Sequence, residues 1–291
     1  MLSVLLLGSP QLLLDQRPLR VTRRKSRALV YYLAAHAEPR TRDHLLAFFW
    51  PDHDRVAAQQ ILRTTLHGLR QALGPALVVD EDSLTLAPDT RIDTRLFESS
   101  LGQVTTDLQH LTSILDLYRG DFLEGFALRD APAFDDWVTA EQEHYRRLVV
   151  RGLTVLSQLH RISHDLPAAL EALTRALAFD PLQEDLQRAA LRMQYLSGDR
   201  AGAIRRYDHL RKLLDEEMGV PPMAETRVLY DAILADTLPI ELQSPTADGR
   251  CPTGSPSYPT TDLHTWPSFF RDYSLHWARC RIANAARLGL A

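Results

Sequence analysis

The amino-acid sequence predicts a mainly α protein, with a small α+β module at the N-terminus and an all-α part after it. Short apolar runs and turn signals alternate with three helical segments over residues 1–91. Over residues 92–239 the apolar spacing is helical throughout, and no convincing strand interrupts it. Within that stretch a pattern recurs after 34 residues, as in proteins built from stacked helix pairs.

Short strands open the chain. Residues 2–7 form an apolar run, and turn signals at 8–10 and 15–18 separate it from short strands at 11–14 and 19–21. The opening run has no positively charged residue before it and is too short for a signal peptide or a membrane span. We therefore expect a strand there.

Three helices should follow, over residues 24–37, 42–50 and 54–73. Thr41 is a good N-cap for the second, and Gly74-Pro75 stops the third. The next residues, 77–79 and 84–86, read as a hairpin across 80–83. Strands, three helices and a closing hairpin describe a winged helix-turn-helix, which we place at residues 1–91.

The repeat lies in the second predicted domain, residues 92–239. Residues 164–170 align with 198–204, and the register continues to residues 179 and 213. The first copy closes with Asp180-Pro181, so period and ending fit a tetratricopeptide-like helical repeat. Two copies could also arise by chance in a chain rich in Ala and Leu.

Six prolines fall between residues 239 and 267, with Ser, Thr and Gly between them. This composition predicts that 240–291 is a disordered tail, with a possible short helix near 274–288.

Charge is divided unevenly along the chain. Residues 1–75 carry eleven Lys/Arg and five Asp/Glu, whereas residues 76–291 carry twenty-two and thirty-two. A compact basic module attracts phosphates, so double-stranded DNA is a candidate partner. A cluster of solvated charge is the alternative.

The helix expected at 54–73 supplies a candidate reading face. Leu62, Leu66, Leu69 and Leu73 share one side, which should be buried. The opposite side has no acidic residue and carries side chains that bond base edges. The predicted base-contacting residues are Gln60, Arg63, Thr64, His67 and Gln71. Any surface helix is polar outside, so this signal is mild alone.

Basic residues around that face suit phosphate contacts, which position a protein on DNA without specifying sequence. The predicted backbone-contacting residues are Arg23, Arg24, Lys25, Arg27, Arg42, Arg55 and Arg70. For each one separately, a solvated or structural role is an equal alternative.

Nothing in the sequence indicates an enzyme, a metal site or a cofactor. It contains no HExxH, no Walker loop and no GxGxxG, and its two cysteines lack zinc spacing. Neighbouring carboxylates at 135–136 and 141–143 are explained as solvated charge. Low cysteine content and the lack of a membrane span predict a cytoplasmic protein.

Motifs in a fixed order resemble a known family. They are Leu6-Leu7-Gly8, Arg23-Arg24-Lys25-Ser26-Arg27-Ala28-Leu29, Leu45-Leu46-Ala47-Phe48-Phe49-Trp50-Pro51, Leu62-Arg63, Leu66, Leu69-Arg70, Leu73-Gly74, Asp93, Phe97, Tyr118-Arg119-Gly120-Asp121-Phe122-Leu123, Trp137-Val138, Glu141, Asp180-Pro181 and Gly219-Val220. Together they resemble bacterial transcriptional activators of the antibiotic regulatory protein type over about residues 1–238. Longer members continue into an ATPase module, whose phosphate loop this chain lacks, so the resemblance predicts a shortened relative.

The resemblance implies binding to promoter DNA at direct repeats, by protomers that associate on the DNA, and recruitment of RNA polymerase. It also implies that the polymerase-contacting loop is Pro51, Asp52, His53 and Asp54. Such a protein would act in the cytoplasm, associated with the nucleoid. The alternative is a protein-interaction scaffold, whose helical repeats bind a partner and whose winged helix does not read sequence.

Overall fold

The structure is a computed structural model that describes residues 1–102 and 107–238. The described residues belong to one compact unit. The predicted tail, 240–291, and its possible helix near 274–288 lie outside the described residues. The domain limits at residues 91 and 239 stay predictions.

The first residues of the chain form a sheet with β7, and the order of its four strands is β3-β2-β1-β7. Its strands are β1 (Leu2–Leu5), β2 (Gln11–Leu14), β3 (Arg17–Pro18) and β7 (Arg91–Ile92). β1 and β2 are antiparallel, whereas β7 pairs with β1 in parallel. The apolar opening run is therefore a strand, as expected.

The third strand was predicted at residues 19–21 and is at 17–18 instead. The chain reverses over only two residues, Asp15 (φ 49°) and Gln16 (φ 66°), both in the left-handed region. After such a two-residue turn the next residues pair directly with the preceding strand, so β3 begins at Arg17. The predicted turn was two residues too long.

The winged helix-turn-helix follows as expected. It consists of α1 (Arg24–Ala35), α2 (Arg42–Phe49), α3 (Arg55–Leu73), the 3₁₀ turn η1 (Gly74–Ala76), and a sheet of β4 (Arg40–Thr41), β5 (Leu77–Val79) and β6 (Ser83–Leu86). Thr41 caps α2 by accepting a hydrogen bond from the His44 N–H at 3.3 Å. α1 ends two residues earlier than predicted, because His36 is already extended (φ −106°, ψ 129°).

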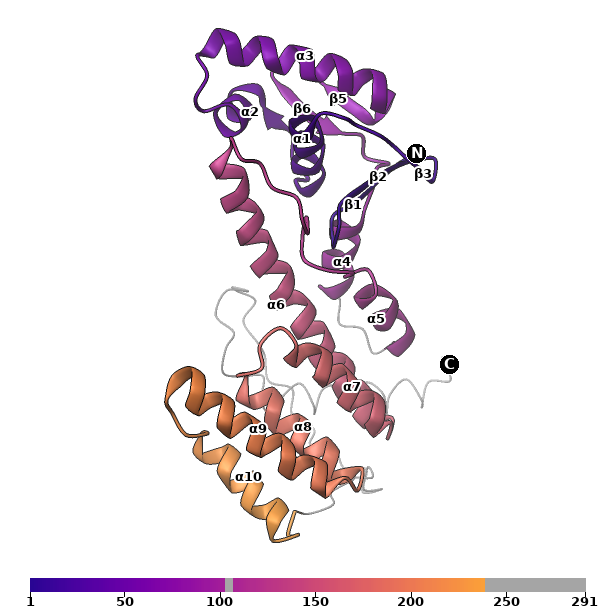
Figure 1. Ribbon diagram of the computed structural model, residues 1–291. Helices are drawn as coiled ribbons and strands as arrows, with labels where there is room; N and C mark the ends of the chain where they lie inside the picture. The colour runs from indigo at the N-terminus through magenta and orange to yellow at the C-terminus, as the bar shows by residue number, and fades with distance from the viewer. Residues whose placement is uncertain (103–106, 239–291) are drawn as a thin grey trace, which may run out of the picture. The chain divides into compact units, whose positions relative to one another are not determined.

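Helices make up the rest of the described chain. They are α4 (Asp93–Leu101), α5 (Leu108–Leu115), α6 (Pro132–Ile162), α7 (Leu166–Leu177), α8 (Glu184–Leu196), α9 (Arg200–Met218) and α10 (Ala224–Leu234). From α6 to α10, each helix packs on the next one in the chain (Figure 1). This is the arrangement expected of helical repeats, which cannot bury their apolar faces alone.

The 34-residue period is visible in the caps of α7 and α9. Asp165 and Asp199 are the N-caps, and each carboxylate accepts a hydrogen bond from the N–H three residues on, at 3.1 and 2.8 Å. The aligned Ala169 and Ala203 are both fully buried. The repeat is therefore structural rather than an accident of composition.

Asp93 joins the N-terminal sheet to the helices. Its carboxylate accepts hydrogen bonds from the N–H groups of Leu6 (2.8 and 2.9 Å), Leu7 (3.1 Å) and Thr94 (2.9 Å). Arg119 adds an ion pair at 3.1 Å. Burial raises the pKa of Asp93, and these donors oppose that rise.

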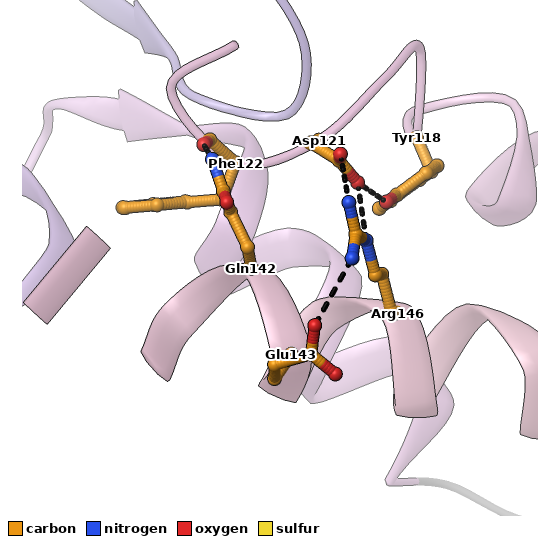
Figure 2. Close-up of polar contacts among 6 residues, drawn as sticks. All are labelled: Tyr118, Asp121, Phe122, Gln142, Glu143 and Arg146. Atoms are coloured by element: carbon orange, nitrogen blue, oxygen red, sulfur yellow. Dashed lines mark hydrogen bonds and ion pairs between the residues drawn. The ribbon is translucent and has the colours of Figure 1, made fainter. Parts of the chain in front are cut away.

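The loop before α6 adds a second connection. Leu7 bridges to Phe122, and the Leu123 N–H donates to the Leu6 carbonyl at 2.8 Å. Figure 2 shows how α6 holds this loop: Arg146 grips the Asp121 carboxylate with two nitrogens. Bidentate arginine pairs fix geometry more firmly than single contacts.

Gln142 and Tyr118 complete the same network. The Gln142 amide donates to the Phe122 carbonyl at 2.9 Å, and the Tyr118 hydroxyl donates to Asp121 at 2.8 Å (Figure 2). Hydrogen bonding to Arg146 lowers the pKa of Asp121. The loop is thus tied to α6 on one side and to β1 on the other.

Replacing Asp93 tests the first connection. In Asp93→Asn the amide offers one acceptor oxygen instead of two, so buried N–H groups lose their partner. We expect the free energy of unfolding to fall by about 1–3 kcal/mol, measured by urea denaturation. Asp136→Asn, on the exposed side of α6, is the control. If both substitutions lowered the free energy of unfolding equally, Asp93 would not be a special connection between the N-terminal sheet and the helices.

Candidate nucleic-acid interface

α3 has two clearly different sides. Leu62, Leu66, Leu69 and Leu73 are buried, as their spacing predicted. The five predicted base-contacting residues all lie on the opposite side and are exposed: Gln60, Arg63, Thr64, His67 and Gln71. No Asp or Glu occurs anywhere in α3. The face is therefore open to solvent in the described part of the chain and carries no carboxylate.

Polar contacts on this face are sparse and local. The Thr64 hydroxyl donates to the Gln60 carbonyl at 3.0 Å, and the Gln71 amide lies 3.1 Å from the His67 ring. The Arg63 guanidinium has no ion pair or hydrogen bond within the described residues. Its donors are free for an external acceptor.

The loop between α2 and α3 is also exposed. Pro51, Asp52, His53 and Asp54 all face solvent. Asp54 has a structural task as well, because its carboxylate caps α3 by accepting from the Ala57 N–H at 2.9 Å. Asp52 has no such bond among the described contacts.

The predicted phosphate-contacting residues separate into two groups. Arg23, Arg24, Arg55 and Arg70 are exposed. Arg55 pairs with Asp43 of α2 at 3.0 Å, with both side chains 71% exposed. Exposed pairs of this kind contribute little and exchange readily for other partners.

Lys25, Arg27 and Arg42 are half-buried and have partners inside the protein. The Lys25 ammonium donates to the Phe49 carbonyl at 2.7 Å and pairs with Asp130 at 2.8 Å. Hydrogen bonding to Lys25 lowers the pKa of Asp130.

Arg42 donates to the Asp80 carbonyl of the hairpin at 3.1 Å. The Arg27 guanidinium lies over the Phe126 ring, 5.5 Å from its centroid. Local patterns did not predict these long-range contacts, and roles on DNA for Lys25, Arg27 and Arg42 stay predictions.

An aromatic cluster joins α1 and α2 to α6, and local sequence patterns did not predict it. Tyr32 lies 4.9 Å from Trp137 of α6, and Phe49 lies 5.8 Å from Phe134, measured between ring centroids. Tyr32 donates or accepts a 2.7 Å hydrogen bond with His44. Aromatic contacts of this kind bury large areas and fix orientation, so α6 supports the winged helix directly.

The paired carboxylates have structural partners. Asp135 accepts from the Leu128 N–H at 2.9 Å, and Glu141 accepts from the Trp137 ring N–H at 3.1 Å. Burial raises the pKa of Glu141. Within residues 1–102 and 107–238, no three His, Cys, Asp or Glu side chains gather as a metal site would require. No helix in those ranges has the length and apolar character to cross a membrane.

Comparisons with known proteins match this chain to bacterial transcriptional regulators. A family model described as the bacterial transcriptional activator domain matches residues 94–234. The regulatory protein AfsR of Streptomyces griseus is 29% identical over 206 residues, covering 67% of this chain and 20% of that protein. The transcriptional regulatory protein EmbR of Mycobacterium tuberculosis is 25% identical over 248 residues, covering 79% and 62%.

A solved structure agrees in fold. Mycobacterium tuberculosis EmbR, in complex with a low-affinity phosphopeptide, superposes with a TM-score of 0.65 at 22% sequence identity. The match covers 81% of this chain and 65% of that chain. This chain therefore spans only about a fifth of AfsR and less than two thirds of EmbR.

Loss of the α3 cap should destabilise the site. Asp54→Ala removes the carboxylate that accepts from the Ala57 N–H, and we expect a loss of about 1 kcal/mol in unfolding free energy. Thermal or urea unfolding measures it. Asp54→Ser keeps a capping oxygen and should retain most of the stability. Equal loss in both variants would contradict a capping role.

Proposed function

We propose that this chain, whose residues 94–234 match the bacterial transcriptional activator domain family, is a sequence-specific DNA-binding transcriptional activator. The observation that carries the proposal is the exposed, carboxylate-free face of α3. A helix that presents Arg, Gln, Thr and His without opposing negative charge suits the edges of base pairs. The protein would act in the cytoplasm, on nucleoid DNA.

In the proposed complex α3 lies in the major groove. Its 19 residues span roughly 28 Å at 1.5 Å per residue, enough to follow the groove. Arg63 can donate two hydrogen bonds to a guanine, and Gln60 or Gln71 can pair with an adenine. Thr64 and His67 complete the reading face.

Phosphate contacts come from the exposed cations. Arg23, Arg24, Arg55 and Arg70 lie at the surface and can reach the backbone on either side of α3. Lys25, Arg27 and Arg42 make contacts inside the protein as well, and their charges add to the local positive potential. Contacts from these three residues to the DNA backbone remain part of the proposal.

The activating contact is proposed for the loop of Pro51, Asp52, His53 and Asp54. It is exposed and directly precedes α3, so a protein bound beside the DNA could reach it. RNA polymerase is the proposed partner. Direct repeats, each bound by one protomer with the protomers side by side, would set the operator spacing.

Arg63→Ala tests the reading face. After selection of a preferred sequence from random duplexes, we expect this variant to bind that sequence about 1–3 kcal/mol more weakly, with random DNA affected little. Fluorescence anisotropy at ~0.15 M salt, a physiological ionic strength, measures both affinities. Arg91→Ala, at an exposed residue of β7, is the control.

Two outcomes would contradict the proposed face. One is an Arg63→Ala protein that binds the selected sequence like the wild type. The other is a selection that yields no preferred sequence, which would favour the scaffold alternative.

Asp52→Ala separates activation from binding. If the loop contacts polymerase, the variant should bind promoter DNA normally while transcription from that promoter in vitro falls several-fold. Asp89→Ala, another exposed carboxylate, is the matched control. Transcription equal to the wild type would remove Asp52 from the activating surface.

A further inference from the structure

A pocket of about 320 Å³ lies beside the reading face of α3. The residues before and within the first turn of α1 form one wall, including Arg20, Arg23 and Ser26. The middle of α3 forms the other wall, with Thr64 and Thr65 among its residues. None of the residues that line the pocket is acidic. The pocket therefore combines apolar lining with two arginines and carries no negative charge.

Two residues that line this pocket are buried, but their hydroxyl oxygens are open to it and have no partner in the described part of the protein. Ser26 is 6% exposed and Thr65 is 5% exposed, and both line the pocket. Neither hydroxyl makes a hydrogen bond to any residue that the structure describes. A hydroxyl that opens into a pocket without an internal partner can donate a hydrogen bond to an acceptor there. These two hydroxyls are therefore available to a ligand that accepts hydrogen bonds.

The start of α1 adds further donors. Its N-cap, Arg23, makes no side-chain capping bond, and no acidic residue occurs in the first turn. The first N–H groups of a helix have no partner within the helix, and the helix dipole makes them attractive to an anion. A capping residue such as Thr41 or Asp54 satisfies them in α2 and α3, but α1 lacks one.

Positive side chains complete the site. Arg20 and Arg23 are exposed, and neither forms an ion pair with another described residue. Two free guanidinium groups, unpaired backbone N–H groups and two hydroxyls suit a phosphate group.

We propose that this pocket receives one phosphate of the DNA backbone while α3 lies in the major groove. The inference rests on the proposed function and adds a defined anchor to it. Thr64 and His67 belong to both the pocket and the reading face, so the two sites share a border. A major groove about 12 Å wide brings its flanking phosphates against the sides of a bound helix.

This anchor would set the register of the complex. A phosphate held at the start of α1 fixes how far α3 slides along the groove, because pocket and reading face are parts of one rigid module. Arg20, Ser26 and Thr65 thereby join Arg23 as DNA-contacting residues, although the sequence pattern marked only Arg23.

The test uses the full chain and the duplex selected above, with random duplex as a second ligand. In Arg20→Ala/Arg23→Ala, affinity for both duplexes should fall about tenfold at ~0.15 M salt, and the slope of log K against log[salt] should become shallower by about 0.9 for one lost phosphate contact. Arg17→Ala/Arg91→Ala, with the same charge change at exposed strand residues, is the control. Unfolding midpoints verify that both proteins fold.

A methylphosphonate scan locates the phosphate. Each phosphate of the selected duplex is replaced in turn by the neutral analogue. One position should weaken wild-type binding about tenfold and leave binding of Arg20→Ala/Arg23→Ala nearly unchanged. Ser26→Ala should lose about threefold and be less sensitive at that same position.

These experiments distinguish failure of the pocket assignment from failure of the proposed function. If wild-type protein binds the selected duplex but the pocket and control variants weaken equally, the pocket assignment is overturned and the proposed function stands. The pocket assignment is also overturned if, at every methylphosphonate position, the losses in binding free energy from the analogue and from Arg20→Ala/Arg23→Ala are additive. If wild-type protein binds no DNA, the proposed function is overturned and this site with it.

Discussion

The Asp93 carboxylate is the constraint on which the arrangement of the molecule depends. It stands at the start of α4, yet its acceptors satisfy N–H groups at the end of β1, 86 and 87 residues earlier in the chain. A buried carboxylate is costly unless donors surround it, and here three backbone N–H groups and Arg119 do so. The pairing works only if strand and helix meet in this position, so it fixes their relative placement.

The same joint makes the reading face rigid. One continuous apolar core runs from the N-terminal strands through α1–α3 and into α8. α6 supports α1 and α2 through Trp137 and Phe134, and it grips the loop at Asp121. Binding sites gain precision when packing locks the elements that carry them. The helical part therefore holds α1 and α2 in place, and with them the module that carries the proposed reading face.

Local patterns in the sequence were enough to predict α3, its buried leucines and the 34-residue repeat that includes α7 and α9. The first two depend on residues within a few turns of one another. Contacts between distant segments were not predictable: nothing local links Lys25 to Asp130, or Tyr32 to Trp137. The pocket beside α3 was missed for the same reason, because Ser26 and Thr65 come together only in the folded chain. The third strand was misplaced because the tight turn at Asp15 and Gln16 depends on backbone angles that composition does not specify.

In the proposed complex, α3 enters the major groove with its carboxylate-free face toward the bases. Dimethyl sulfate protection measures this directly, since the reagent attacks guanine N7 in the major groove and adenine N3 in the minor groove. We predict that guanine N7 atoms within the bound sequence are protected, and that Arg63→Ala loses this protection at one guanine. Protection confined to adenine N3, or a guanine pattern that Arg63→Ala leaves unchanged, would contradict it.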